Sequence, residues 1–86
     1  MEIKLFLSNF FKETRGLEYE ELEKVTDLVE AQILDSFMWM NLLMQVEDLF
    51  RCELDVDLLV EQRTVTDLLH FIEQAIEISK KSEGIF

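Results

Sequence analysis

Residues 33–50 read ILDSFMWMNLLMQVEDLF and indicate the central helix of the molecule. Asp35 is a favourable N-cap, because its carboxylate can accept hydrogen bonds from the free N–H groups of the first helical turn, where Ser36 lies. Apolar residues follow at helical spacing. We therefore expect a helix that starts at Asp35 and Ser36 and ends near residues 51–53. Its predicted buried face is Met40, Leu43, Val46 and Phe50, flanked by Phe37, Leu42 and Leu49.

One further helix is predicted before this segment and another after it. The earlier helix stops at Gly16, and Lys12 and Arg15 suit the negative end of its dipole. Thr64 is a suitable N-cap for the last helix, and Asp67 stands in the capping-box position three residues later. The two buried stripes are predicted to be Ile3, Phe6, Leu7 and Phe10, and Val65, Leu68, Leu69, Ile72 and Ile76.

The connection before the central helix is long. Residues 17–35 are predicted as an ordered loop, with a helical tendency around residues 20–25. Thr26 and Asp27 indicate a turn, because both side chains compete for backbone hydrogen bonds. The core side chains of this loop are predicted to be Leu28 and Val29. A loop of this length in a small domain usually serves a function.

The remaining pattern completes an all-α fold. Residues 55–62 predict one or two helical turns that bury Leu58 and Leu59. The chain has no proline and only two glycines, and it lacks the turn clusters that bound strands. We expect a single domain over residues 1–86, built as a small bundle of three main helices and one short helix.

The charge of the chain is strongly acidic. Its 86 residues include 19 acidic and 8 basic side chains, which gives a formal net charge of -11. Because nucleic-acid affinity depends on neutralising phosphates, we expect no nucleic-acid partner. An anionic membrane surface would also repel the chain. Suitable partners carry basic surfaces.

The sequence predicts a cytoplasmic protein. Cys52 is the only cysteine, so an intrachain disulfide is impossible, and a single thiol is typical of a reducing compartment. The N-terminal stretch does not resemble a signal peptide, because Glu2 stands where a positive charge is needed. The longest apolar run is residues 37–40, which is far too short to cross a membrane, so no membrane insertion is expected.

No catalytic or metal site is predicted. His70 is the only histidine and is expected on the surface, and Cys52 is expected to be a small packing residue. Asp55 and Asp57 lack the glycine and the distal glutamate of a calcium loop. Ser36 has no neighbouring base that would make it a hydrolytic nucleophile, which argues against a small hydrolase. On these grounds alone, Ser36 is simply a residue at a helix start.

A family resemblance gives Ser36 another meaning. Residues 26–37, TDLVEAQILDSF, resemble the phosphopantetheine attachment segment of acyl and peptidyl carrier proteins, in which Asp-Ser is followed by a bulky apolar residue. The form Ile-Leu-Asp-Ser-Phe is similar to stand-alone carriers of the D-alanyl type. Residues 46–54 and 64–72 resemble the acidic end of the family's second helix and the start of its last helix. The resemblance spans residues 26–76.

Several positions depart from the family pattern. Gln32 stands where glycine is usual, which suggests a different turn in the loop, and Asp55 stands where proline is frequent. Met38 and Trp39 occupy positions that are commonly polar and face partners. At Leu59 many fatty-acid carriers have a smaller residue, so the resemblance implies a fuller core that hides a long acyl chain poorly.

The resemblance implies the following function. Ser36 would bear a 4′-phosphopantetheine arm, taken from coenzyme A and attached covalently, and Asp35 is the flanking motif residue. The chain would be a monomeric carrier and not an enzyme, holding acyl or aminoacyl groups as thioesters. The implied partners are a phosphopantetheinyl transferase, an acyl- or aminoacyl-loading ligase, and downstream transferase or synthase enzymes. The expected partner-binding residues are Glu30, Phe37, Met38, Trp39, Glu47 and Asp48.

Two questions stay open on the sequence. Fatty acyl, polyketide, D-alanyl and other aminoacyl carriers share these residues, so the cargo is undetermined. The alternative class is a non-enzymatic acidic helical interaction module, in which Met38 and Trp39 form a docking patch and Ser36 is only a capping residue.

Overall fold

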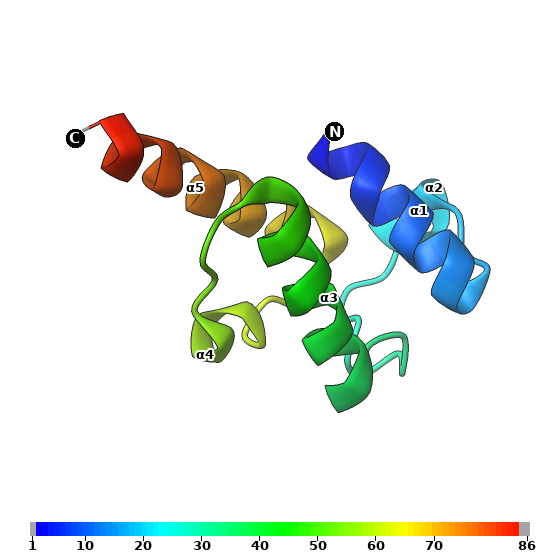
Figure 1. Ribbon diagram of the computed structural model, residues 1–86. Helices are drawn as coiled ribbons and strands as arrows, with labels where there is room; N and C mark the ends of the chain where they lie inside the picture. The colour runs from blue at the N-terminus through cyan, green and yellow to red at the C-terminus, as the bar shows by residue number, and fades with distance from the viewer. Residues whose placement is uncertain (1, 85–86) are drawn as a thin grey trace.

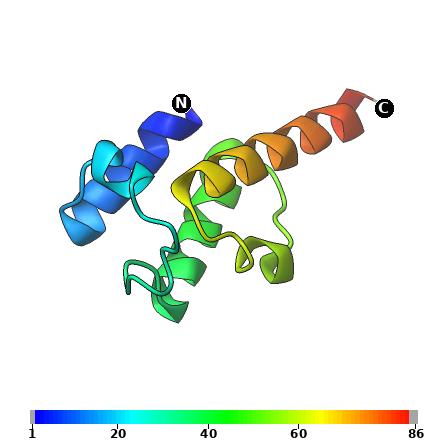
Figure 2. The ribbon, with the colours of Figure 1, turned by 180° about the vertical axis from the view of Figure 1, so that it is seen from behind.

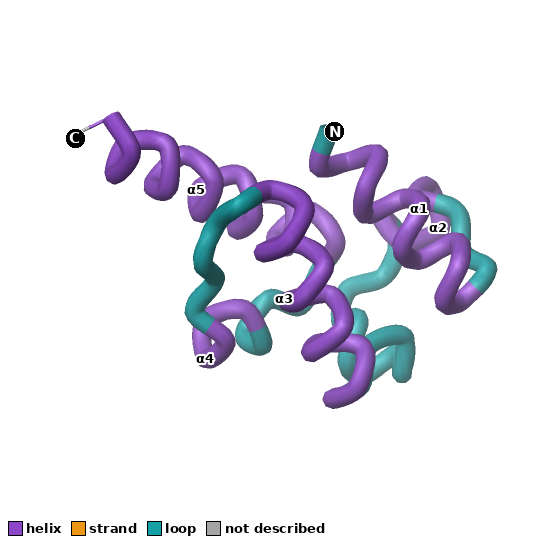
Figure 3. Tube along the Cα trace, viewed as in Figure 1, coloured by secondary structure: helices purple, strands orange, loops and turns teal. Residues whose placement is uncertain are grey.

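The computed structural model describes residues 2–84, with the side chains of residues 2–80. This part of the chain contains helices and loops but no strand, which confirms the predicted all-α class (Figures 1 and 3). The helices are α1 (Ile3–Arg15), α2 (Tyr19–Glu23), α3 (Ser36–Phe50), α4 (Val56–Leu59) and α5 (Val65–Gly84). The short helix α2 is additional to the predicted three main helices and one short helix.

Helix α1 packs through an aromatic stripe. Phe6, Leu7 and Phe10 are buried as predicted, and Phe11 is buried as well. The ring of Phe6 meets that of Phe50 in α3 edge to face, with 5.7 Å between centroids. Such an arrangement places the positive edge of one ring against the negative face of the other. This contact joins the first helix to the end of the central one.

Helix α3 has the predicted bounds but a different buried face. Its buried side chains are Met38, Trp39, Leu42 and Val46. Of the predicted face, Met40 is 50% exposed, so that assignment is wrong for it, while Leu43 and Phe50 are only partly buried. The helix carries apolar residues on nearly every side, so its spacing fits more than one stripe. The larger buried area of the tryptophan favours the observed one.

The loop before α3 is ordered, as predicted. The N–H of Leu28 donates to the carbonyl of Arg63 (2.7 Å), which ties the loop to the turn before α5. The carbonyl of Leu28 accepts from Ile33 and Leu34 (2.9 and 3.1 Å). One carboxylate oxygen of Asp27 accepts from the N–H groups of the two residues that follow Leu28. These bonds fix the direction in which the chain enters α3.

The last two helices complete the core. The Thr64 hydroxyl accepts from the N–H of Asp67 (3.1 Å), which confirms the predicted cap of α5. Leu59 in α4 is fully buried, but Leu58 is 48% exposed, so its predicted burial is wrong. A single helical turn directs neighbouring side chains to different sides and buries only one of them. Seen from behind in Figure 2, the C-terminal half of α5 projects beyond the other helices.

Gln32 occupies a backbone conformation that favours glycine. Its φ is 60°, in the left-handed region, and its N–H donates to the carbonyl of Val29 (3.0 Å). The loop therefore keeps a left-handed residue at the position where the family that this segment resembles usually has glycine. For a residue with a Cβ this conformation costs about 1–2 kcal/mol.

We expect Gln32→Gly to raise the free energy of unfolding by about 0.5–1 kcal/mol, because the relieved strain exceeds the extra entropy of a glycine in the unfolded chain. Urea denaturation measures this change. The matched control is Gln74→Gly, in the helical interior of α5, which should lower stability by about 1 kcal/mol. A loss of stability in both variants would contradict the assignment of strain to Gln32.

Candidate functional site

Ser36 lies at the start of α3 with its side chain exposed. Asp35 is the N-cap, and its carboxylate oxygen Oδ1 accepts from the N–H of Met38 (2.9 Å). This bond fixes the first turn of the helix, as the sequence predicted. The hydroxyl of Ser36 is therefore presented at the positive end of the α3 dipole, where an attached anionic group is stabilised.

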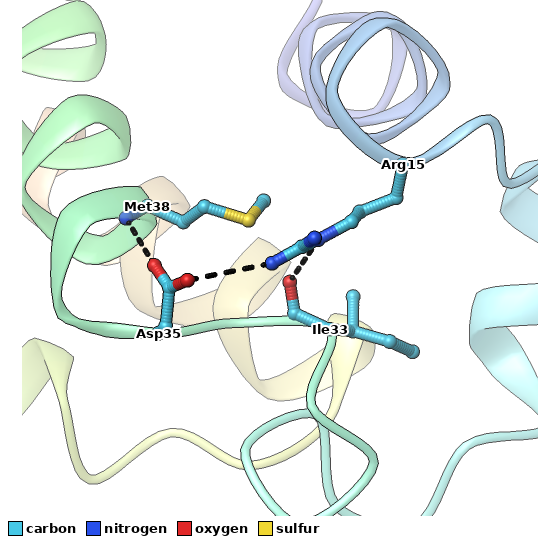
Figure 4. Close-up of polar contacts among 4 residues, drawn as sticks. All are labelled: Arg15, Ile33, Asp35 and Met38. Carbon is cyan, nitrogen blue, oxygen red and sulfur yellow. Dashed lines mark hydrogen bonds and ion pairs between the residues drawn. The ribbon is translucent and has the colours of Figure 1, made fainter.

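Arg15 links the end of α1 to this site (Figure 4). Its Nε donates to the carbonyl of Ile33 (3.0 Å), and Nη2 lies 3.5 Å from Oδ2 of Asp35. Sequence reasoning placed Arg15 only as a favourable charge at a helix end. Nothing in the local pattern indicates the contact, because the partners are 18 and 20 residues away.

An open pocket of about 590 Å³ lies beside Ser36. Its volume falls within the roughly 300–1,000 Å³ typical of small-molecule sites. The lining combines one cation, one carboxylate, polar groups and apolar side chains, as the lining residues are Arg15, Val29, Gln32, Leu34, Asp35, Ser36 and Trp39. The site therefore offers both charged and apolar contacts to a group attached at the serine.

Of the six expected partner-binding residues, four are at least partly exposed and two are buried. Glu30, Phe37 and Asp48 are exposed. Glu47 is partly buried, and its carboxylate accepts from the N–H of Leu54 (2.9 Å), which fixes the chain after α3. This structural contact of Glu47 was not foreseen from the sequence.

Met38 and Trp39 are buried, with 5% and 7% of their surfaces exposed. The expectation that they present apolar contacts to partners is therefore wrong, because both belong to the stripe of α3 that faces the core. Leu49 is an exposed apolar side chain near the end of the helix (51%). Three others are Phe37 (77%), Met40 (50%) and Met44 (66%). Their i, i+3, i+7 spacing places them on one face of α3.

The remaining reactive side chains lie away from Ser36. His70 is exposed on α5, as predicted. Cys52 is buried, and burial raises the pKa of its thiol, with a further contribution from the carboxylate of Glu47. A raised pKa keeps the sulfur in its weakly nucleophilic thiol form. Among the described residues, no three His, Cys, Asp or Glu side chains lie close enough together to hold a metal ion. None of the described helices is long and apolar enough to cross a membrane.

The fold and the site together define a class of protein. A small helical domain that presents an exposed serine at a helix start is suited to carrying an attached group. Comparison with known families identifies the class: the profile described as "Phosphopantetheine attachment site" matches residues 7–72. The chain belongs to this family. The predicted family is thereby confirmed, whereas the finer resemblance to the D-alanyl type stays a prediction.

Three curated relatives support the assignment. The chain is 36% identical to an acyl carrier protein of Coprothermobacter proteolyticus over 67 residues, which cover 78% of this chain and 82% of the relative. It is 40% identical over 73 residues to the non-reducing polyketide synthase pigA of Monascus ruber, covering 85% of this chain. It is 37% identical over 70 residues to the clavatol synthase claF of Penicillium crustosum, covering 81% of this chain.

The lengths of these relatives differ greatly. The chain spans only 3% of each of the two fungal synthases. No solved structure matches the chain in the corresponding comparison. Family membership makes the matched residues a carrier domain that uses covalently attached 4′-phosphopantetheine, and domains of this family are not themselves catalytic. The comparisons thus favour the carrier over the alternative of a plain interaction module.

Proposed function

We propose that Ser36 is the residue that bears the 4′-phosphopantetheine arm. The observation that supports this most strongly is its exposed position at the capped start of α3, within the matched segment. A phosphopantetheinyl transferase would join the Ser36 oxygen to the phosphorus of the phosphopantetheine part of coenzyme A. The bridging P–O bond of the pyrophosphate breaks, adenosine 3′,5′-bisphosphate leaves, and the hydroxyl proton passes to a base of the transferase.

The protein's contribution after modification is mechanical and electrostatic. The thiol of the arm holds the cargo as a thioester and supplies the reactive chemistry. The first turn of α3, fixed by Asp35, holds the attachment point and favours an anion there. Tethering raises the effective concentration of the cargo at each partner enzyme. These requirements are met by a small bundle without a catalytic cleft.

Ser36→Ala should fold normally and gain no phosphopantetheine mass. The test is intact-mass measurement after incubation with coenzyme A and a broad-specificity transferase. The matched control is Ser79→Ala in α5, which should gain the mass of a single arm as the unsubstituted chain does. The assignment would be overturned if Ser36→Ala gained the mass of the arm. It would also be overturned if neither the unsubstituted chain nor Ser79→Ala gained that mass.

We further propose that partners dock on the exposed side of α3 and the loop before it. Phe37, Met40 and Met44 supply apolar contact, and Asp48 lies one turn beyond Met44 on the same side of the helix. Glu30 adds negative charge in the preceding loop. Glu47 is a secondary contributor, because its carboxylate already accepts a backbone hydrogen bond. The partners of such a surface are enzymes with basic and apolar patches, including the transferase, a loading ligase and downstream synthases.

Asp48→Lys should slow modification by the transferase about threefold at low ionic strength, because rim charges chiefly affect association. The difference should shrink as salt is added. Initial rates across salt concentrations provide the measurement, and Glu77→Lys, an equal charge reversal on exposed α5, is the matched control. Asp48 is chosen over Glu47, whose reversal would also break the bond to Leu54. Equal rates for both variants and the unsubstituted chain would contradict this docking face.

The cargo is proposed to be short or polar and to remain in solvent. Leu42, Val46 and Leu59 are fully buried where a long acyl chain would have to enter the bundle. Forcing extra volume into a packed core costs roughly 1–3 kcal/mol. Both short acyl groups and the D-alanyl group suggested by the sequence satisfy this condition.

Loading a long fatty acyl chain should therefore leave the NMR signals of Leu42, Val46 and Leu59 close to their positions in the unloaded modified form. Shifts should concentrate at Ser36 and its neighbours. A short acetyl cargo serves as the control. The proposal would be refuted if the long acyl chain, but not the acetyl group, caused large shifts at Leu42, Val46 and Leu59. Such shifts would show that the core opens.

A further inference from the structure

Arg15 is held in an orientation that directs its guanidinium toward the attachment site. Its Nε donates to the carbonyl of Ile33, at 3.0 Å, across the gap between the end of α1 and the loop (Figure 4). This bond leaves the two terminal nitrogens of the guanidinium for other acceptors. Nη2 is the nitrogen nearest Asp35, the residue next to Ser36.

The existing contact between Arg15 and Asp35 is weak. The distance from Nη2 to Oδ2 is 3.5 Å, at the outer limit for a hydrogen bond, and 61% of the Asp35 side chain is exposed. Exposed pairs of this kind contribute little to stability. The other oxygen of Asp35 is bound to the N–H of Met38 (2.9 Å), so this carboxylate has an anchor that does not depend on Arg15.

We propose that Arg15 binds the phosphodiester that modification places on Ser36 and so holds the base of the arm against the neighbouring pocket. This inference rests on the proposed function. A phosphodiester is anionic and presents two oxygens, which the planar guanidinium can bind together. Ser36 follows Asp35 directly and lines the same pocket as Arg15, which places a phosphate on Ser36 close to the guanidinium.

The charges around the site explain why a cation is needed there. A phosphodiester on Ser36 stands next to the carboxylate of Asp35 and follows a loop that carries Glu30. Arg15 is the one basic side chain among the residues that line the pocket described beside Ser36. Placed between the two anions, it offsets their repulsion, while Gln32 and Trp39 offer polar and apolar surface to the arm beyond the phosphate.

A thermodynamic cycle tests the contact. Urea unfolding is measured for unmodified and modified forms of the chain, of Arg15→Gln and of Lys12→Gln, each with its mass verified. Lys12 lies on the same helix and pairs with Glu18, away from the pocket, so its replacement is the matched control for charge. The effect of modification on the folding equilibrium constant should be about three- to tenfold more favourable in the unsubstituted chain than in Arg15→Gln, and this difference should shrink with salt.

The two possible roles of Arg15 give different results in this cycle. If Arg15 only joined α1 to the loop, Arg15→Gln would change the unmodified and modified forms by the same factor, and the inference would be overturned. Lys12→Gln should respond to modification as the unsubstituted chain does. The stabilisation that modification gives Arg15→Lys should fall between the values for the unsubstituted chain and for Arg15→Gln. The lysine keeps the charge but loses the guanidinium's ability to bind two oxygens at once.

NMR supplies a readout that does not depend on stability. Modification should shift the Nε–H signal of Arg15, and the phosphorus signal of the arm should move between the modified chain and modified Arg15→Gln. Unchanged signals in both measurements would overturn the inference. A chain that gains no mass would contradict the proposed function. A modified chain in which Arg15→Gln has the same effect on stability before and after modification would contradict only the role of Arg15.

Discussion

The burial of one stripe of α3 determines how the rest of the molecule is arranged. Trp39, Leu42 and Val46 turn toward the core, and fully burying side chains of this size stabilises the fold by roughly 1.5–3 kcal/mol each. Because the stripe is fixed, the opposite side of the helix must face solvent. Phe37, Met40 and Met44 are exposed as a direct consequence. The orientation of the proposed attachment serine and of the proposed partner face thus follows from packing on the other side of the same helix.

The loop before α3 sets where the serine stands, and backbone hydrogen bonds hold it together with the buried side chains of Leu28 and Leu34. Leu28 is its fully buried anchor, and its N–H and carbonyl both bind backbone partners. Gln32 accepts a left-handed conformation within the same turn. A segment fixed by its own backbone tolerates changes in its exposed side chains. Those side chains are then available for contacts with the arm and with partners.

The sequence predicts the caps of the long helices well, misses the short helix α2 and predicts the tertiary contacts poorly, for a physical reason. Asp35, Gly16 and Thr64 act through bonds to residues only a few positions away, so their roles are visible locally. The buried face of α3 was mispredicted because apolar residues surround the helix, and periodicity cannot choose among several stripes. The contact of Arg15 with Ile33 bridges 18 residues and leaves no periodic signal. Attachment at Ser36 came from resemblance to a family, since helix capping alone would equally explain an Asp-Ser pair.

The proposed partner face of α3 would combine two kinds of recognition that act on different steps of an encounter. A net charge of -11 attracts basic surfaces over a Debye length of about 8–10 Å and so raises the rate of association. Apolar contacts act only at close range and chiefly set how long a complex lasts. A carrier that visits several enzymes must also leave each one, so its apolar area has to stay small. Three exposed apolar side chains on one face of α3, Phe37, Met40 and Met44, meet that condition, while the acidic surface provides attraction without a long-lived complex.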